Sequence, residues 1–114
     1  MQLDRDSAHL WDILDAARTI TQFISDANSE SYLVDRKLQL AVERLLEIIG
    51  EAAGKISRDF KQAHSEIPWR EMIGQRNILA HEYGRIEQQR IWSTVTTDIP
   101  ELIKMIEPLI PPLP

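Results

Sequence analysis

Apolar residues recur every three or four positions over most of the chain, which is the spacing of amphipathic α-helices. The first series covers residues 10–27, and Phe23 is expected to widen its apolar face. A second, longer series covers residues 34–56 and has extra apolar positions, which favours burial against several neighbours or across a subunit interface. The intervening DANSES reads as a turn, with Ser29 or Ser31 available to cap the next helix.

The second half of the chain continues this helical pattern. The polar stretch 57–67 predicts a brief helix and a connecting turn. Pro68 favours a new helix start, because a first turn does not need its missing N–H. We therefore predict a helix over residues 68–83, ended by Gly84. A last apolar series covers residues 92–109.

Proline shapes the C-terminal region. Pro100 should kink the last helix, or split it with Asp98 capping the second half. The final PLIPPLP cannot continue a helix and is expected to form an extended tail. Neither a β pattern nor an internal repeat appears. The predicted class is all-α, a bundle of four long helices plus a short one with a Pro-rich C-terminal tail, in a single domain over residues 1–114.

Two glycines lie inside the long second helix. Gly50 and Gly54 lower its helix propensity, but they allow another helix to approach closely.

The composition limits the classes of function. A chain of 114 residues can bury one modest core, and 43% hydrophobic residues suit a globular protein. The absence of cysteine excludes a disulfide framework and a thiolate metal site. The N-terminal sequence lacks the basic and apolar regions of a signal peptide, and no stretch approaches the length of a membrane span. We expect a soluble, cytoplasmic protein.

The charge is unevenly distributed. The net charge of −5 argues against a general nucleic-acid binder. Residues 55–90 hold 7 basic and 5 acidic residues, a balance of +2, while the remainder holds 6 and 13, a balance of −7. The basic excess therefore surrounds one unusual segment, although ordinary scatter also accounts for two charges.

That segment is QRNILAHEYG, residues 75–84. It places Arg76, Asn77, His81 and Tyr83 on a predicted helix. At about 100° per residue, Asn77 and His81 are neighbours, Tyr83 lies on the line of Arg76, and the four spread over roughly half the circumference. The stem of Arg76 is expected to cross apolar ground. One helix alone does not bring Arg76 and His81 together, whereas a cleft in a symmetric dimer would.

These side chains have defined chemistry. Histidine moves a proton near neutral pH, and arginine holds a phosphate through two hydrogen bonds. Asparagine can orient the histidine or donate to an oxyanion. With an RNA 2′-OH as the nucleophile, no metal and no cofactor is needed. From residue types alone, a polar cluster that satisfies buried backbone groups at a helix end is the preferred interpretation.

The extended motif IPWREMIGQRNILAHEYG resembles the signature of the HepT-like branch of the HEPN superfamily, R-N-x-x-x-H-x-Y. Here the motif residues are Arg76, Asn77, His81 and Tyr83, preceded by the upstream matches Pro68, Trp69, Arg70, Ile73 and Gly74. The helix order and chain length also match, so the resemblance covers nearly the whole chain.

The resemblance implies a function. Such proteins are typically toxins with metal-independent endoribonuclease activity, with tRNA or mRNA as expected targets, and they form homodimers whose motifs face one cleft. By this resemblance Arg76, Asn77 and His81 are catalytic. It further implies neutralisation by a MntA-like nucleotidyltransferase, which adenylylates Tyr83. The homodimer and this partner can form a larger hetero-oligomer. The alternative reading is a non-catalytic helical partner or nucleotide-binding module of a nucleotidyltransferase complex.

Other residues have simpler interpretations. Four basic residues are candidates for holding RNA backbone or are ordinary solvated charges: Arg70, Arg85, Arg90 and Lys55. Glu43, Glu47 and Glu51 repeat every four residues and read as a solvated acidic stripe, or as a docking surface for a basic patch on the partner. The three tryptophans, Trp11, Trp69 and Trp92, are expected to anchor the core, and His9 and His64 to be surface or structural.

Overall fold

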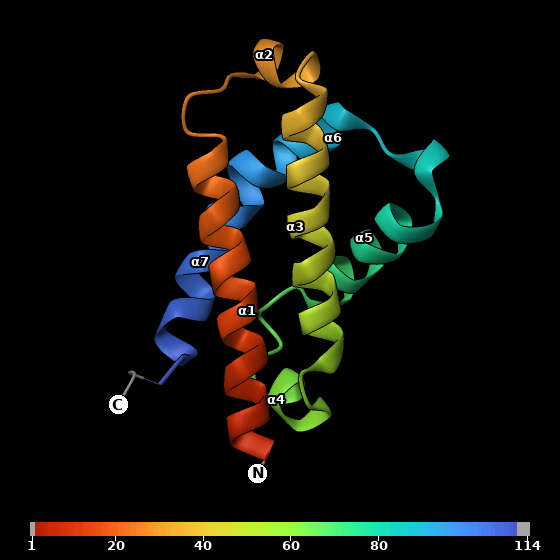
Figure 1. The fold of residues 1–114 in the computed structure, drawn as a ribbon. Coiled ribbons are helices and arrows are strands. Elements are labelled where there is room, and N and C mark those ends of the chain that lie inside the picture. The colour runs from red at the N-terminus through yellow and green to blue at the C-terminus, as the bar shows by residue number, and fades with distance from the viewer. Residues whose placement is uncertain (1, 112–114) are drawn as a thin grey trace.

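A computed structural model describes residues 2–111, and over this range the chain is all-α with no strand. The long helices α1 (Gln2–Phe23) and α3 (Arg36–Lys55) run side by side in opposite directions (Figure 1). Helix α5 (Trp69–His81) packs on α3, and α7 (Ile99–Ile106) packs on α1. The predicted helical bundle is thus confirmed.

Short elements connect these helices. They are α2 (Ser29–Leu33), α4 (Arg58–Ala63), the 3₁₀ turn η1 (Tyr83–Arg85), α6 (Gln88–Ser93), the π-helical turn η2 (Thr94–Asp98) and the 3₁₀ turn η3 (Glu107–Leu109). The brief helix expected in the polar stretch after α3 is α4. Among the described residues, no helix is both long and apolar enough to span a membrane.

The turn after α1 contains a helix that the sequence did not predict. Asn28 caps α2, because its side chain accepts from the backbone N–H of Ser31 at 2.9 Å and the Ser31 hydroxyl accepts from the N–H of Asn28 at 3.0 Å. Asp35 in turn caps α3 by accepting from the N–H of Leu38 at 3.0 Å. The expectation that Ser29 or Ser31 caps the long helix was therefore wrong.

The end of α1 also differs from the prediction. The apolar series through Ile13 and Ile20 is buried as expected. The helix ends at Phe23, however, where the ring is 48% exposed and does not widen the buried face. Past the helix end, the three-four spacing no longer determines which side of the chain faces the core.

The broad apolar face of α3 is explained within one subunit. Helix α1 packs along one side of α3 and α5 along another (Figure 1). Between them they bury the apolar residues Val42, Leu46, Ile49, Ala52 and Ala53. The width of this face therefore gives no separate argument for a subunit interface.

Pro100 was expected to kink the last helix or to split it with Asp98 as the cap of the second half, and the second alternative is wrong. Asp98 has α-helical backbone angles and no side-chain capping bond, so its expected capping role was wrong. The five-residue π turn η2 instead precedes α7, with Pro100 at the start of α7. A π turn widens the hydrogen-bond register, which accommodates a residue that lacks an N–H.

Part of the predicted tail is folded. Pro108 lies in η3, and Ile110 follows with extended backbone angles. The rest of the predicted tail, residues 112–114, lies outside the described residues.

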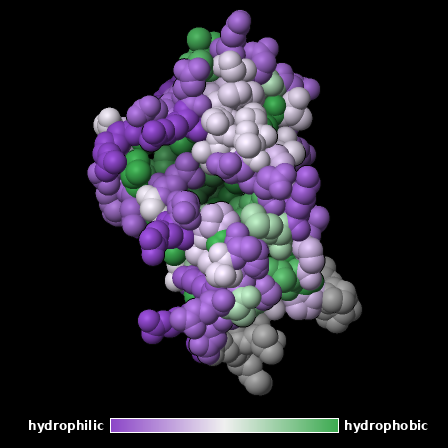
Figure 2. Space-filling model, turned by 180° about the vertical axis from the view of Figure 1, so that it is seen from behind, coloured by the Kyte–Doolittle hydropathy of each residue, from purple (hydrophilic) through white to green (hydrophobic). Residues whose placement is uncertain are grey.

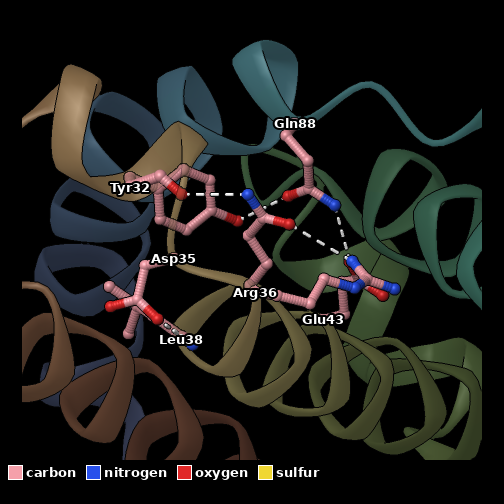
Figure 3. A network of polar contacts seen from close by, with 7 residues as sticks. Tyr32, Asp35, Arg36, Leu38, Glu43 and Gln88 are labelled. Atoms are coloured by element: carbon pink, nitrogen blue, oxygen red, sulfur yellow. Dashed lines mark hydrogen bonds and ion pairs between the residues drawn. The ribbon is translucent and has the colours of Figure 1, made fainter.

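A partly buried polar network fixes α6 to the bundle (Figure 3). Gln88, the first residue of α6, donates to the Glu43 carboxylate at 2.6 Å and accepts from the Tyr32 hydroxyl at 2.8 Å. Arg36 also donates to Glu43, at 3.3 Å. Since Glu43 is buried, it is not part of a solvated stripe as predicted. The network anchors the end of the segment that leaves α5.

Candidate active site

Helix α5 stops before the tyrosine of the motif. Its last residue is His81, and Glu82 leaves the helix with φ −132° and ψ 59°. Tyr83 belongs to η1 and is 73% exposed, so it does not lie on the line of Arg76 as a continuous helix would place it. No described residue has a positive φ, so Gly84 does not end the helix through a left-handed conformation. The predicted end at Gly84 was wrong.

Arg76 is fixed by the close approach of α5 to α3. A Cβ placed at Gly50 would overlap the Cβ of Arg76 and lie 2.7 Å from the carbonyl oxygen of Met72. Gly50 therefore serves the close approach predicted from its position in the helix. Gly54 does not, since a Cβ there would meet no atom within 4 Å. The Arg76 side chain is about one-third exposed, which agrees with a stem lying on buried ground.

The guanidinium of Arg76 has two polar neighbours. Its Nη1 donates to the Asn77 side-chain oxygen at 3.2 Å, and its Nε lies 3.9 Å from the Glu51 carboxylate. That Nε is buried and has no hydrogen-bond partner. Glu51 also lies 3.4 Å from Arg44. Sequence reasoning missed this role of Glu51. The four-residue spacing from Glu47 shows only that the two side chains lie on the same face of the helix.

The motif residues do not all converge. Arg76 and Asn77 line a hollow between α5 and α3, whose α3 side includes Gly54 and Lys55. His81 is exposed and lies five residues further on, about 140° around the helix from Arg76, and it does not line this hollow. As predicted, one helix does not aim Arg76 and His81 at one point.

The candidate RNA-binding residues are all exposed. Lys55 borders the hollow beside Arg76, and Arg70 borders a groove between α4 and α5. Arg85 and Arg90 border a groove formed by α5, η1 and α6, and Arg85 pairs with Glu82 at 3.0 Å. The structure thus distributes them around α5 rather than on one patch.

The tryptophans differ in their environment. Trp69 is buried and donates to the carbonyl oxygen of His64 at 3.0 Å, and Trp92 packs against the Tyr32 ring. Trp11 is 43% exposed, with Arg18 6.0 Å from its ring, so its expected role as a core anchor was wrong. His64 packs on the Phe60 ring, which fits its predicted structural role.

Comparison with known families decides the relationship. The family described as "Ribonuclease HepT-like" matches residues 13–109, which include α3, α5 and every motif residue named above. The chain belongs to the HepT-like family of the HEPN superfamily. Its helical bundle is the fold of this superfamily.

Curated relatives of this HepT-like chain carry related names. "Probable ribonuclease HepT" from Thermococcus cleftensis is 46% identical over 101 residues, covering 89% of this chain and 92% of the relative. "Putative RNase MJ1380" from Methanocaldococcus jannaschii is 39% identical over 100 residues, covering 88% and 92%. These names indicate ribonuclease activity in the family. No solved structure matches the chain.

Proposed function

We propose that this HepT-like protein is a metal-independent endoribonuclease toxin of a toxin–antitoxin pair. The observation that carries the proposal is the placement of Arg76 on α5. Its Cβ packs against Gly50 of α3, its guanidinium donates to Asn77 at 3.2 Å, and His81 lies exposed further along α5. A fixed arginine and an accessible histidine are the two groups that phosphodiester transesterification needs.

The reaction uses the substrate's own nucleophile. His81 takes the proton of an RNA 2′-OH, and the 2′-oxygen attacks the adjacent phosphorus. The bond to the 5′-oxygen breaks, and that oxygen leaves with a proton returned by a histidine. Arg76 stabilises the charge on the crowded phosphate, and Asn77 orients the guanidinium. The products are a 2′,3′-cyclic phosphate and a 5′-hydroxyl.

A homodimer completes this site. Arg76 and His81 diverge by about 140° on one helix, so two copies facing one cleft would place an arginine of one subunit opposite a histidine of the other. Arg70, Arg85, Arg90 and Lys55 surround α5 and would contact the RNA backbone on either side.

A MntA-like nucleotidyltransferase would silence the toxin through Tyr83. Its phenol is exposed on η1, which makes it accessible to the active site of another protein. The phenolic oxygen attacks the α-phosphorus of ATP, pyrophosphate leaves, and the phenolic proton passes to a base of the partner. The added phosphodiester carries about one negative charge, which repels an RNA phosphate and attracts nearby arginines.

Cleavage assays test the proposed chemistry. Arg76→Ala and His81→Ala should each lower the cleavage rate by roughly 10²–10⁴-fold and abolish growth inhibition, with an unchanged circular dichroism spectrum. His64→Ala is the matched control. Wild-type cleavage should persist in EDTA and leave a 2′,3′-cyclic phosphate. A magnesium requirement or a 3′-hydroxyl product would contradict the mechanism, and partner binding without any cleavage would support the non-catalytic alternative.

Mass spectrometry tests the proposed modification. Co-expression with the partner should add whole AMP units to Tyr83 and stop RNA cleavage. Tyr83→Phe should remain unmodified and toxic. AMP on another residue, with Tyr83 unmodified, would remove Tyr83 from this role.

A further inference from the structure

The hollow beside Arg76 has a charge that suits one phosphodiester. Among its lining residues Lys55 and Arg76 are positive and Glu51 is negative, which leaves a net charge of +1. The Glu51 carboxylate is compensated, because it lies 3.4 Å from Arg44 and 3.9 Å from Arg76. It therefore holds Arg76 from the side of Nε, while Lys55 remains exposed at the end of α3.

Gly54 leaves the hollow open. It lies inside α3 and is exposed, and a Cβ added there would meet no atom within 4 Å. Gly50, one helical turn earlier, is needed for the contact with α5, whereas Gly54 serves no packing contact in this subunit. A glycine within a helix is unfavourable relative to alanine, and it allows the close approach of a ligand.

We propose that this hollow is the phosphate-binding pocket of the site and that it seats the RNA phosphodiester held by Arg76. Lys55 supplies the second cation, and Gly54 provides room for the sugar–phosphate backbone. This inference rests on the proposed ribonuclease function. It assigns the C-terminal end of α3 to the substrate, in addition to the motif on α5.

Salt-dependent binding tests the role of Lys55. The probe is a short fluorescein-labelled 2′-O-methyl RNA, whose blocked 2′-oxygens prevent cleavage, and binding is followed by fluorescence anisotropy. Loss of one contact to single-stranded RNA should reduce the magnitude of the slope of log association constant against log salt concentration by about 0.7. Near 0.1 M salt this corresponds to an affinity about fivefold lower. Lys55→Gln should show this loss.

Lys37→Gln is the matched control for charge. Lys37 is exposed on the same helix, 18 residues before Lys55, and therefore points in the same direction about 27 Å away. This variant loses the same charge outside the hollow and should keep the wild-type salt slope.

Substitutions of Gly54 test the role of the open space. Gly54→Ala should keep or raise the thermal unfolding temperature, because the added methyl group meets nothing and alanine favours the helix. Gly54→Leu should fill the hollow and weaken RNA binding on the order of tenfold. Circular dichroism checks the fold of both variants. If Gly54→Leu fails to fold, Gly54→Ala serves as the test, and it should show a smaller loss of RNA affinity.

The outcomes separate this inference from the proposed function. Wild-type protein that neither binds nor cleaves RNA would overturn the ribonuclease proposal itself. If Arg76→Ala is defective while Lys55→Gln and Gly54→Leu bind like wild type, only the pocket is wrong. Competition by adenosine monophosphate at concentrations equal to those of the RNA would make the hollow a mononucleotide site and overturn its assignment to an RNA strand.

Discussion

At the scale of single residues, the position of Arg76 depends on a neighbour from another helix. Glu51 lies 3.9 Å from the buried Nε of Arg76, which has no hydrogen-bond partner. A carboxylate at this distance attracts the guanidinium without forming a full hydrogen bond. Glu51 is thus a positioning residue for the proposed catalysis, because it acts through Arg76.

Glu51→Gln should therefore separate kcat from KM. We expect kcat for RNA cleavage to fall about tenfold, equal to about 1.4 kcal/mol of activation free energy, because Arg76 is held less firmly. KM should stay constant or fall, since removing the carboxylate also removes repulsion of a phosphate. Glu47→Gln is the matched control, because Glu47 pairs with Arg44 at 3.7 Å but not with Arg76. Equal effects of the two substitutions would contradict this role.

A second single residue, Tyr32, makes the stability of the fold depend on pH. Burial raises the pKa of the Tyr32 phenol above its ordinary value, and the Glu43 carboxylate raises it further, while Arg36 lowers it. The folded state therefore favours the neutral phenol. Its contribution to stability is fully present below the unfolded pKa of about 10 and is lost as the pH rises through the folded pKa.

The alkaline unfolding curve should show this effect. Above about pH 10 the free energy of unfolding should fall more steeply for the wild type than for Tyr32→Phe, by up to about 1.4 kcal/mol per pH unit. Denaturant titrations at several pH values measure the difference. Tyr83→Phe, which removes an exposed phenol, should keep the wild-type slope. Parallel curves for the wild type and Tyr32→Phe would refute the prediction.

At the scale of secondary-structure elements, α3 is the scaffold of the site. Its side toward α5 holds Gly50, where the two helices touch, and its last turn holds Gly54 and Lys55 beside the hollow. The hydrogen bond from Gln88 to Glu43 holds α6 on α3, so both ends of the segment between α5 and α6 are anchored to the bundle. η1, with Tyr83, projects between these anchors (Figure 1).

The two glycines of α3 should respond in opposite directions to alanine. Gly50→Ala adds a methyl group that overlaps Arg76, so α5 must shift, at a cost of roughly 1–3 kcal/mol of unfolding free energy and with loss of activity. Gly54→Ala should instead stabilise the protein by up to about 1 kcal/mol. Urea titrations provide the comparison. Destabilisation of equal size at both positions would contradict the assignment of the effect to the contact with Arg76.

At the scale of the whole molecule, apolar side chains line a second hollow, away from the one beside Arg76. A groove between α3, α5 and α7 is lined by apolar residues that include Leu46, Ile49, Met72 and Met105. Figure 2 shows the molecule from behind, with apolar atoms at the bottom of a hollow and hydrophilic atoms around it. The apolar face of α3 that the sequence offered for a subunit interface is largely used inside one subunit.

The remaining argument for a dimer is the divergence of the motif. We expect a homodimer in which the exposed side of α5 with Asn77 and His81 faces its symmetry mate, burying on the order of 800 Å² per subunit. Analytical ultracentrifugation should find the dimer at micromolar concentration. Mixing Arg76→Ala with His81→Ala subunits should then restore part of the activity, because one intact composite site forms. A monomer that cleaves RNA at full rate would overturn the composite site.

The sequence by itself determined the long helices α1 and α3, the class of fold and the family. The three-four spacing of apolar residues places α1 and α3, because local periodicity decides which residues of a helix can be buried together. Pro68 marks the start of α5. The motif residues Arg76, Asn77, His81 and Tyr83 led to the family because their register along the chain is itself the signal.

Only the tertiary structure decided which neighbours these residues have. Local spacing could not show that Gly50 meets Arg76, that Glu51 approaches its Nε, or that Glu43 is buried under Gln88, because each pair joins helices separated in the sequence. The end of α5 at His81 was equally hidden. After it the chain returns to α3, where Gln88 bonds to Glu43, and helix propensity at Tyr83 and Gly84 does not contain that contact.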